Sequence, residues 1–201
     1  MGQRLVVTIE KNEKAIAAIY YHWSAYTYSA LLETEKIIDC IYNSTDETES
    51  ELLLRLIRFC EDNGGGITGT EEYNEHEHIQ KLFPNETFKT DGYSRNNGLI
   101  ALSTKGIAGL QGWSEGDIYI NLDTDQVDFC VYIGYEDINE YIEERKSWDE
   151  DFDEKEMKYI PKFDFSLGCF DASDIDAIIS SLDATNVDVI ECCGEICVMI
   201  E

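Results

Sequence analysis

The sequence predicts a single α+β domain over residues 1–201, with a mainly antiparallel sheet built from hairpins and helices packed against it. Two patterns lead to this prediction. Apolar and polar residues alternate in paired short segments, and apolar residues recur at helical spacing between those pairs. Parallel strands need a long crossover after each strand, so pairing in hairpins favours antiparallel order. No internal repeat or low-complexity linker divides the chain.

Two hairpins account for the clearest strands. Residues 4–10 alternate apolar and polar side chains, and a second apolar run over 15–23 follows a short polar turn. Residues 117–123 and 127–133 repeat this pattern around an Asp-Thr-Asp-Gln turn. Each pair is typical of a β-hairpin.

A first helix is predicted over residues 28–42, because its apolar residues recur at helical spacing. The face that we expect to be buried carries Leu31, Ile38 and Tyr42, with Ile37 and Ile41 beside them.

A second helix is predicted to begin at Thr48, which has capping-box spacing with Glu51, and to end at the glycines 64–66. A shorter helix is expected over residues 71–82, ended by Pro84.

In the last third of the sequence, we expect an amphipathic helix at 137–147, a strand at 162–168 and a helix at 173–183. A closing hairpin over 187–200 is expected to turn near Cys193 and Gly194.

Composition indicates a folded cytoplasmic protein. Hydrophobic residues make up 43% of the chain, which argues against intrinsic disorder. No apolar run is long enough to span a bilayer, and the N-terminus lacks a signal-peptide core. The seven cysteines are odd in number and scattered, and several lie in apolar runs, as Cys130 does. We expect them to be reduced, buried hydrophobes.

The net charge of −27 is far from the value of about 2 to 8 in magnitude that is usual for a small domain. It is also uneven, because residues 133–201 hold 5 basic and 20 acidic groups. A binding face concentrates charge in this way. The balance predicts a basic protein surface as partner and argues against direct DNA binding and against a membrane.

An acidic helix and loop at 136–156 is the sharpest feature, with eleven carboxylates in 21 residues. Carboxylates on a rigid helix can imitate a phosphate backbone, and aromatic side chains among them can anchor an interface. A solvated helix face followed by an acidic loop would show the same composition. The predicted partner-binding residues are Glu136, Asp137, Glu140, Glu143, Glu144, Trp148, Asp149, Glu150, Asp151, Phe152, Asp153 and Glu154.

His22 is the candidate catalytic residue, since it lies among aromatic residues at the end of the first hairpin and is a possible general base. The alternative is a hydrogen-bonded histidine in an aromatic cluster that packs the sheet against a helix.

No metal or cofactor site is predicted. The acids of 149–156 lack the central glycine of a calcium loop, and His76 and His78 lack a third zinc ligand. The glycines 64–66 are not followed by the Lys-Ser/Thr of a P-loop. Gly106, Gly109, Gly112 and Gly116 miss the dinucleotide pattern, and tight turns explain them better.

Three phrases carry a resemblance to a known group. Residues 2–9, 19–27 and 92–100 resemble small proteins of gut Firmicutes phages and prophages, some of which are similar to anti-CRISPR inhibitors of type II-A effector nucleases. The resemblance covers about a third of the chain and maps no functional residue. It implies an RNA-guided nuclease as target, with or without its guide RNA.

Charge and resemblance together predict an acidic, nucleic-acid-mimicking inhibitor that occupies the basic channel of a CRISPR effector nuclease or a similar defence enzyme. Two other functions stay open. The first is a nuclease that disables guide RNA, with His22 or a carboxylate pair as base. The second is an immunity protein that neutralises a basic toxin. The sequence spells out no reaction, so an enzyme is not favoured.

Overall fold

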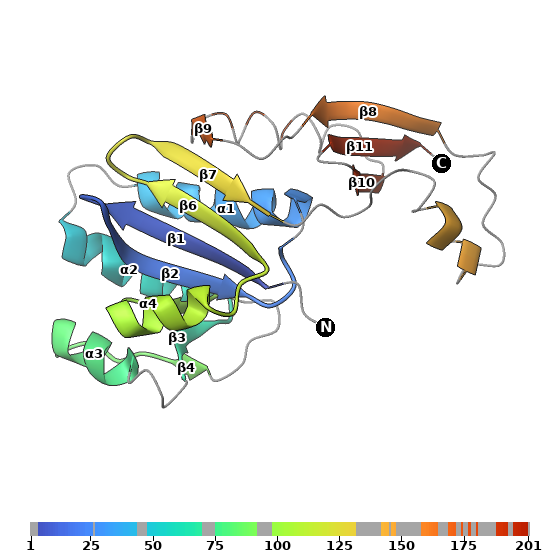
Figure 1. Ribbon diagram of the computed structural model, residues 1–201. Helices are drawn as coiled ribbons and strands as arrows, with labels where there is room; N and C mark the ends of the chain where they lie inside the picture. Colours follow the sequence, from blue (N-terminus) through green and yellow to red (C-terminus); the bar gives the residue numbers. More distant parts are fainter. Residues whose placement is uncertain are drawn as a thin grey trace.

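The computed structural model describes fifteen helices and strands (Figure 1). The described residues are 4–25, 27–43, 48–69, 75–91, 98–131, 142–144, 146–147, 158–164, 169–171, 174, 177, 180, 188–192 and 195–200.

The larger of two sheets has eight strands in the order β4–β3–β5–β2–β1–β6–β7–β9. Four of its neighbouring pairs are antiparallel and three are parallel, so the predicted α+β class with a mostly antiparallel sheet is confirmed. Its strands are β1 (Leu5–Lys11), β2 (Lys14–Tyr21), β3 (Gly66–Thr68), β4 (Thr90–Asp91), β5 (Leu99–Ala101), β6 (Gly116–Asn121), β7 (Gln126–Cys130) and β9 (Cys169–Asp171).

Both predicted hairpins of this sheet are present, as β1–β2 and β6–β7. In the first, Lys11 pairs with Lys14, so only Asn12 and Glu13 form the loop. Both have positive φ, 52° and 60°, as a type I′ turn requires. This turn matches the twist of the strands that it joins.

The parallel pairing of β1 with β6 was not predicted. Leu5 lies opposite Gly116 and Ile9 opposite Ile120, which places the second hairpin directly beside the first. A helix between β5 and β6, α4 (Thr104–Gln111), provides the crossover. The two hairpins therefore form one continuous sheet surface.

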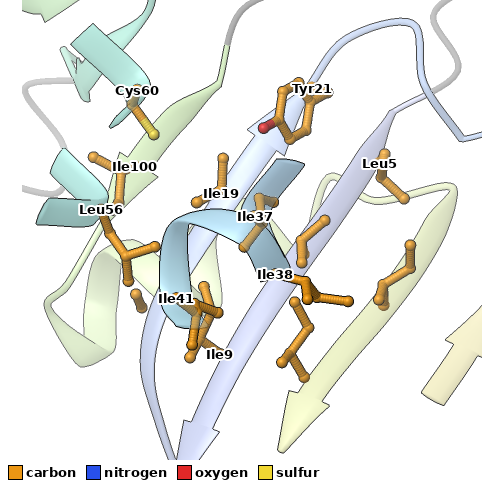
Figure 2. Close-up of a cluster of buried hydrophobic side chains, with 14 of the residues drawn as sticks. Leu5, Ile9, Ile19, Tyr21, Ile37, Ile38, Ile41, Leu56, Cys60 and Ile100 are labelled. Atoms are coloured by element: carbon orange, nitrogen blue, oxygen red, sulfur yellow. The ribbon is translucent and has the colours of Figure 1, made fainter. Parts of the chain in front are cut away.

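One side of this sheet is covered by α1 (Thr27–Tyr42) and α2 (Glu49–Asp62) (Figure 1). Thr48 and Glu51 form the predicted capping box, and Gly64, with φ 87°, follows the helix end. Figure 2 shows the resulting core, in which strand residues and helix residues interdigitate. The labelled side chains are Leu5, Ile9, Ile19, Tyr21, Ile37, Ile38, Ile41, Leu56, Cys60 and Ile100.

Tyr42 corrects the predicted buried face of the first helix. Its side chain is 44% exposed, and its hydroxyl donates to Asp125 Oδ1 at 2.6 Å. The tyrosine lies at the last residue of α1, beyond the edge of the core, and its hydroxyl needs a polar partner. It joins the helix to the β6–β7 turn.

On the opposite side of the sheet, α4 is the described helix that packs on the strands, and it covers β5, β2 and β1. Ile107 and Leu110 of α4 pack there on the apolar outer residues of these strands. Gly106 and Gly109 lie within α4, so the prediction that tight turns explain them was wrong. The helix was missed because its glycines mask its apolar period.

The short helix α3 (Glu75–Leu82) confirms the helix expected before Pro84, and residues 71–74 of that prediction lie outside the described residues. Glu75 at its start is 1% exposed. The helix contacts β3, one of four short strands that sequence patterning missed.

A second, three-stranded sheet has the order β10–β11–β8 and lies to one side of the main sheet (Figure 1). The strands β10 (Asp188–Cys192) and β11 (Glu195–Ile200) form the predicted closing hairpin, and β8 (Lys158–Asp164) begins earlier than the strand predicted at 162–168. Of the two late helices, only residues 142–144, 146, 147, 174, 177 and 180 are described, all as helix. Along the part of the chain that is described, no helix is long and apolar enough to cross a membrane.

Candidate functional site

The predicted contact segment at 136–156 is described only at 142–144, 146 and 147. Glu143 and Glu144 are exposed there, and the Glu143 carboxylate lies 3.5 Å from Lys146 Nζ with 77% of its side chain exposed. Both carboxylates are therefore available to a partner. The other predicted contact residues lie outside the described part: Glu136, Asp137, Glu140, Trp148, Asp149, Glu150, Asp151, Phe152, Asp153 and Glu154.

The structure adds a polar surface that the sequence did not single out. On the side of the sheet that carries α4, the outward side chains of β6 and β7 lie beyond the area that α4 covers. We call this surface the open face. Its residues are Glu10, Asp117, Tyr119, Asn121, Gln126, Asp128, Cys130 and Asp171.

Strand register brings these residues together from four strands. Thr8 of β1 lies opposite Tyr119, which lies opposite Asp128. In the next row, Glu10 lies opposite Asn121, and the row continues through Gln126 to Asp171. The Gln126 amide donates to the Asp171 carboxylate. A third row continues the same surface toward α4. It runs from Asp117 through Val6 and Tyr20 to Leu99.

Carboxylates surround Tyr119 at the centre of the open face. The pKa of its hydroxyl is raised, first by partial burial and then by the negative charges of Asp117 and Glu10. The ring is thus a half-buried aromatic surface in a negative field. Such a site favours a cation over an anion or an apolar group.

Asp117 lies between this ring and α4. Partial burial raises the pKa of its carboxyl, while the Ser114 hydroxyl, 2.8 Å from Oδ2, opposes this shift. A carboxylate with a raised pKa is incompletely solvated, so it gains more from a cationic partner than a fully hydrated one.

The tip of the β6–β7 hairpin is held in place by two of its aspartates. Asp123 Oδ2 accepts from the backbone N–H of Asn12 at 2.6 Å, and Asp125 accepts from Tyr42. These bonds fix the hairpin against the first hairpin and α1. The outer end of the open face is therefore anchored at two points.

The negative charge of the open face is not balanced by basic residues in the same stretch of sequence, because no Lys or Arg occurs between Lys105 and Arg145. This gap is the signal that sequence reasoning overlooked. The observed ion pairs of Arg4, Lys36, Arg58, Lys81 and Lys146 use carboxylates outside the open face: Glu115, Glu33, Glu61, Glu86, Glu77 and Glu143.

An aromatic group borders the open face at the end of α4. Trp113 is 43% exposed and packs edge-on against Tyr20, with the ring centroids 6.3 Å apart. The Tyr20 hydroxyl lies 2.7 Å from Nδ1 of His22, whose ring packs edge-on against the 41% exposed Trp23. His22 thus has the hydrogen bond and ring contacts of an aromatic packing cluster, the alternative to a general base.

No metal-ligating group is formed among the described residues, where His, Cys, Asp and Glu make no cluster of three or more. His76 and His78 lie in α3, and the acids at 149–156 lie outside the described residues. Cys60 is buried as expected, and burial raises the pKa of its thiol. Cys130 is exposed, which corrects its predicted burial: Phe129 and Val131 point into the core, so the residue between them faces outward.

A cleft of about 440 Å³ lies between α1 and α2, on the other side of the sheet. Its basic side chains make internal contacts. Arg58 bonds Glu61 and Glu86, Arg55 donates to the Ile41 carbonyl, and Lys36 pairs with Glu33. Charges of both signs line it, with Asp39 and Asp62 beside these basic residues.

Fold and surface together define an acidic α+β protein with a tyrosine-centred carboxylate face. No family model, curated protein or solved structure matches the chain.

Proposed function

We propose that this protein is an inhibitor that binds the basic nucleic-acid channel of a CRISPR effector nuclease or a similar defence enzyme. The observation that carries the proposal is the net charge of −27 with its concentration after Lys105. A channel lined with Lys and Arg for guide and target attracts such a charge within about 8 Å of screening length. The resemblance of residues 2–9, 19–27 and 92–100 to phage anti-CRISPR proteins supports the choice of partner.

The carboxylates that strand register gathers on the open face and the exposed Glu143 and Glu144 support a binding role. Interfaces that depend on opposite charge associate fast and weaken with salt. In this proposal the segment at 136–156 provides the main contact with the channel.

The test measures binding of the full chain to a purified type II-A effector nuclease, with and without guide RNA, over a salt series. Affinity is expected to fall roughly tenfold or more between low and high salt, because exposed charge pairs are screened. Amide replacement of Glu143, Glu144 and Asp149 should weaken binding, whereas three replacements at exposed acids of α1 to α3, namely Asp39, Asp62 and Glu77, should not. Absence of binding, or a flat salt response, contradicts the proposal.

The same mixture tests the nuclease, and a pull-down from lysate with mass spectrometry tests the immunity protein. Guide RNA that is cut in the presence of the chain, and spared by His22→Ala, would establish the nuclease. Intact RNA removes that alternative. Capture of a basic toxin in place of the effector would establish the immunity protein.

A further inference from the structure

Among the described helices, only α4 packs on the outer side of the main sheet, over β5, β2 and β1. Over β5, β2 and β1 the outward residues are apolar, and α4 packs on them through Ile107 and Leu110. Over β6 and β7 the outward residues are polar, and Asp128 and Cys130 are exposed. No described helix packs on this half. The open face is thus a hydrogen-bonded sheet surface beside α4.

The composition of the open face restricts what can cover it. An apolar partner would strip water from carboxylates of Glu10, Asp117 and Asp128 without compensation, which is costly. A nucleic acid would meet like charge. A cationic protein segment is complementary to this surface, and the absence of Lys and Arg from 106–144 leaves the charge uncompensated along β6 and β7.

Aromatic groups select among cationic segments. Tyr119 presents a partly buried ring in the row between those of Asp117 and Glu10, and Trp113 presents an exposed indole just after α4, next to Ser114, which bonds Asp117. A guanidinium group is planar, stacks on such rings and bonds a carboxylate through two N–H groups at once. An ammonium group is compact and strongly hydrated, and it forms neither contact as well.

We propose that the open face and Trp113 dock an arginine-containing segment of the protein partner, with guanidinium groups stacked on Tyr119 and Trp113 and paired with Asp117, Asp128 and Glu10. This inference rests on the proposed function in taking the partner to be a basic protein. It adds a second contact surface, separate in sequence from 136–156, and names the side chain that the surface recognises.

The first experiment titrates the ¹⁵N-labelled full chain with a nona-arginine peptide and, separately, with a nona-lysine peptide of equal charge. The arginine peptide should bind about two- to fivefold more tightly, as expected for cation–π stacking. Its shifts should concentrate on the amides of β6 and β7 and on the Trp113 indole N–H. Equal affinities, or shifts spread over all acidic surfaces, would overturn the proposal.

The second experiment compares two triple variants of identical charge. One carries Glu10→Gln, Asp117→Asn and Asp128→Asn on the open face. The other carries Asp39→Asn, Asp62→Asn and Glu77→Gln, all exposed residues of α1, α2 and α3. The open-face variant should lose about tenfold in affinity for nona-arginine, and the control threefold or less.

Equal losses in the two triple variants would contradict specific docking. Trp113→Leu and Tyr119→Leu should each abolish the preference for arginine over lysine while leaving lysine binding within about twofold, provided that thermal unfolding shows a folded protein. A preference that survives both substitutions would also overturn the proposal.

Failure of this inference is distinguishable from failure of the proposed function. Effector binding that depends on salt, but is equal for the two triple variants, removes the docking surface and keeps the inhibitor. Arginine-selective binding at the open face without effector binding keeps the surface and removes the inhibitor.

Discussion

Glu75 and Ser103 are joined by two hydrogen bonds that connect α3 to the start of α4. The Ser103 N–H donates to Glu75 Oε1 at 2.9 Å, and the Ser103 hydroxyl donates to Oε2 at 2.6 Å. The N–H of Leu102 adds a third bond, at 2.6 Å. A buried carboxylate thus satisfies backbone groups before the N-terminus of α4, where negative charge is favourable. It fixes the helix that borders the open face.

Removal of the Glu75 carboxylate should destabilise the fold. Glu75→Ala leaves the N–H groups of Leu102 and Ser103 without their acceptor, so we expect the free energy of unfolding to fall by about 2–4 kcal/mol in urea denaturation. Glu75→Gln keeps one carbonyl acceptor and should lose only about 1 kcal/mol. Glu77→Ala, on the exposed side of the same helix, should change stability by less than about 0.5 kcal/mol. Similar losses for Glu75→Ala and Glu77→Ala would contradict the role of Glu75.

Gly106 should resist replacement although it lies inside a helix. Alanine is the better helix former by about 1 kcal/mol, but its Cβ would lie 2.2 Å from Glu75 Oε2 and 2.9 Å from the Cβ of Ala101. The clash should dominate, and Gly106→Ala should lower the free energy of unfolding by about 1–3 kcal/mol. Gly112→Ala is the matched control, because its nearest atom would lie at 3.4 Å. Stabilisation by Gly106→Ala would show that α3 can shift away.

Replacement of Glu13 by glycine should stabilise the protein. Glu13 has a φ of 60° in the two-residue turn between β1 and β2, a conformation that costs a residue with a Cβ about 1–2 kcal/mol. Greater freedom of glycine in the unfolded chain offsets part of this gain. We expect Glu13→Gly to raise the free energy of unfolding by about 0.5 kcal/mol. Asn12→Gly should give no gain, since asparagine tolerates this conformation, and an equal gain at both positions would argue against the explanation.

Glu115 should make stability depend on pH. The backbone N–H of Arg4, and then its guanidinium, hold the pKa of this carboxyl below its ordinary value of 4.5. The stabilisation is therefore present above pH 4.5 and is lost as the pH falls through the lowered value. Melting temperatures of wild type and Glu115→Gln should differ at pH 7 and converge in acid. A difference that persists at low pH would point to a cause other than ionisation.

Local patterning of the sequence was sufficient to locate the two hairpins of the main sheet and its two longest helices. Alternation located the β1–β2 and β6–β7 hairpins, and helical spacing with a capping box located α1 and α2. These signals depend on residues at most a few positions apart. The strands β3, β4, β5 and β9 have only two or three residues, too few to show a period, and were missed.

By itself, the sequence determined the fold class, the hairpins, the main helices and the excess of negative charge. Only the tertiary structure decided that β6 lies parallel to β1, that α4 covers half of one sheet side, and that Cys130 and Tyr42 are exposed. The open face belongs to this second group, since Glu10, Asp117 and Asp171 come from distant segments. Such neighbours are set by strand pairing over long sequence separations, which local periodicity does not encode.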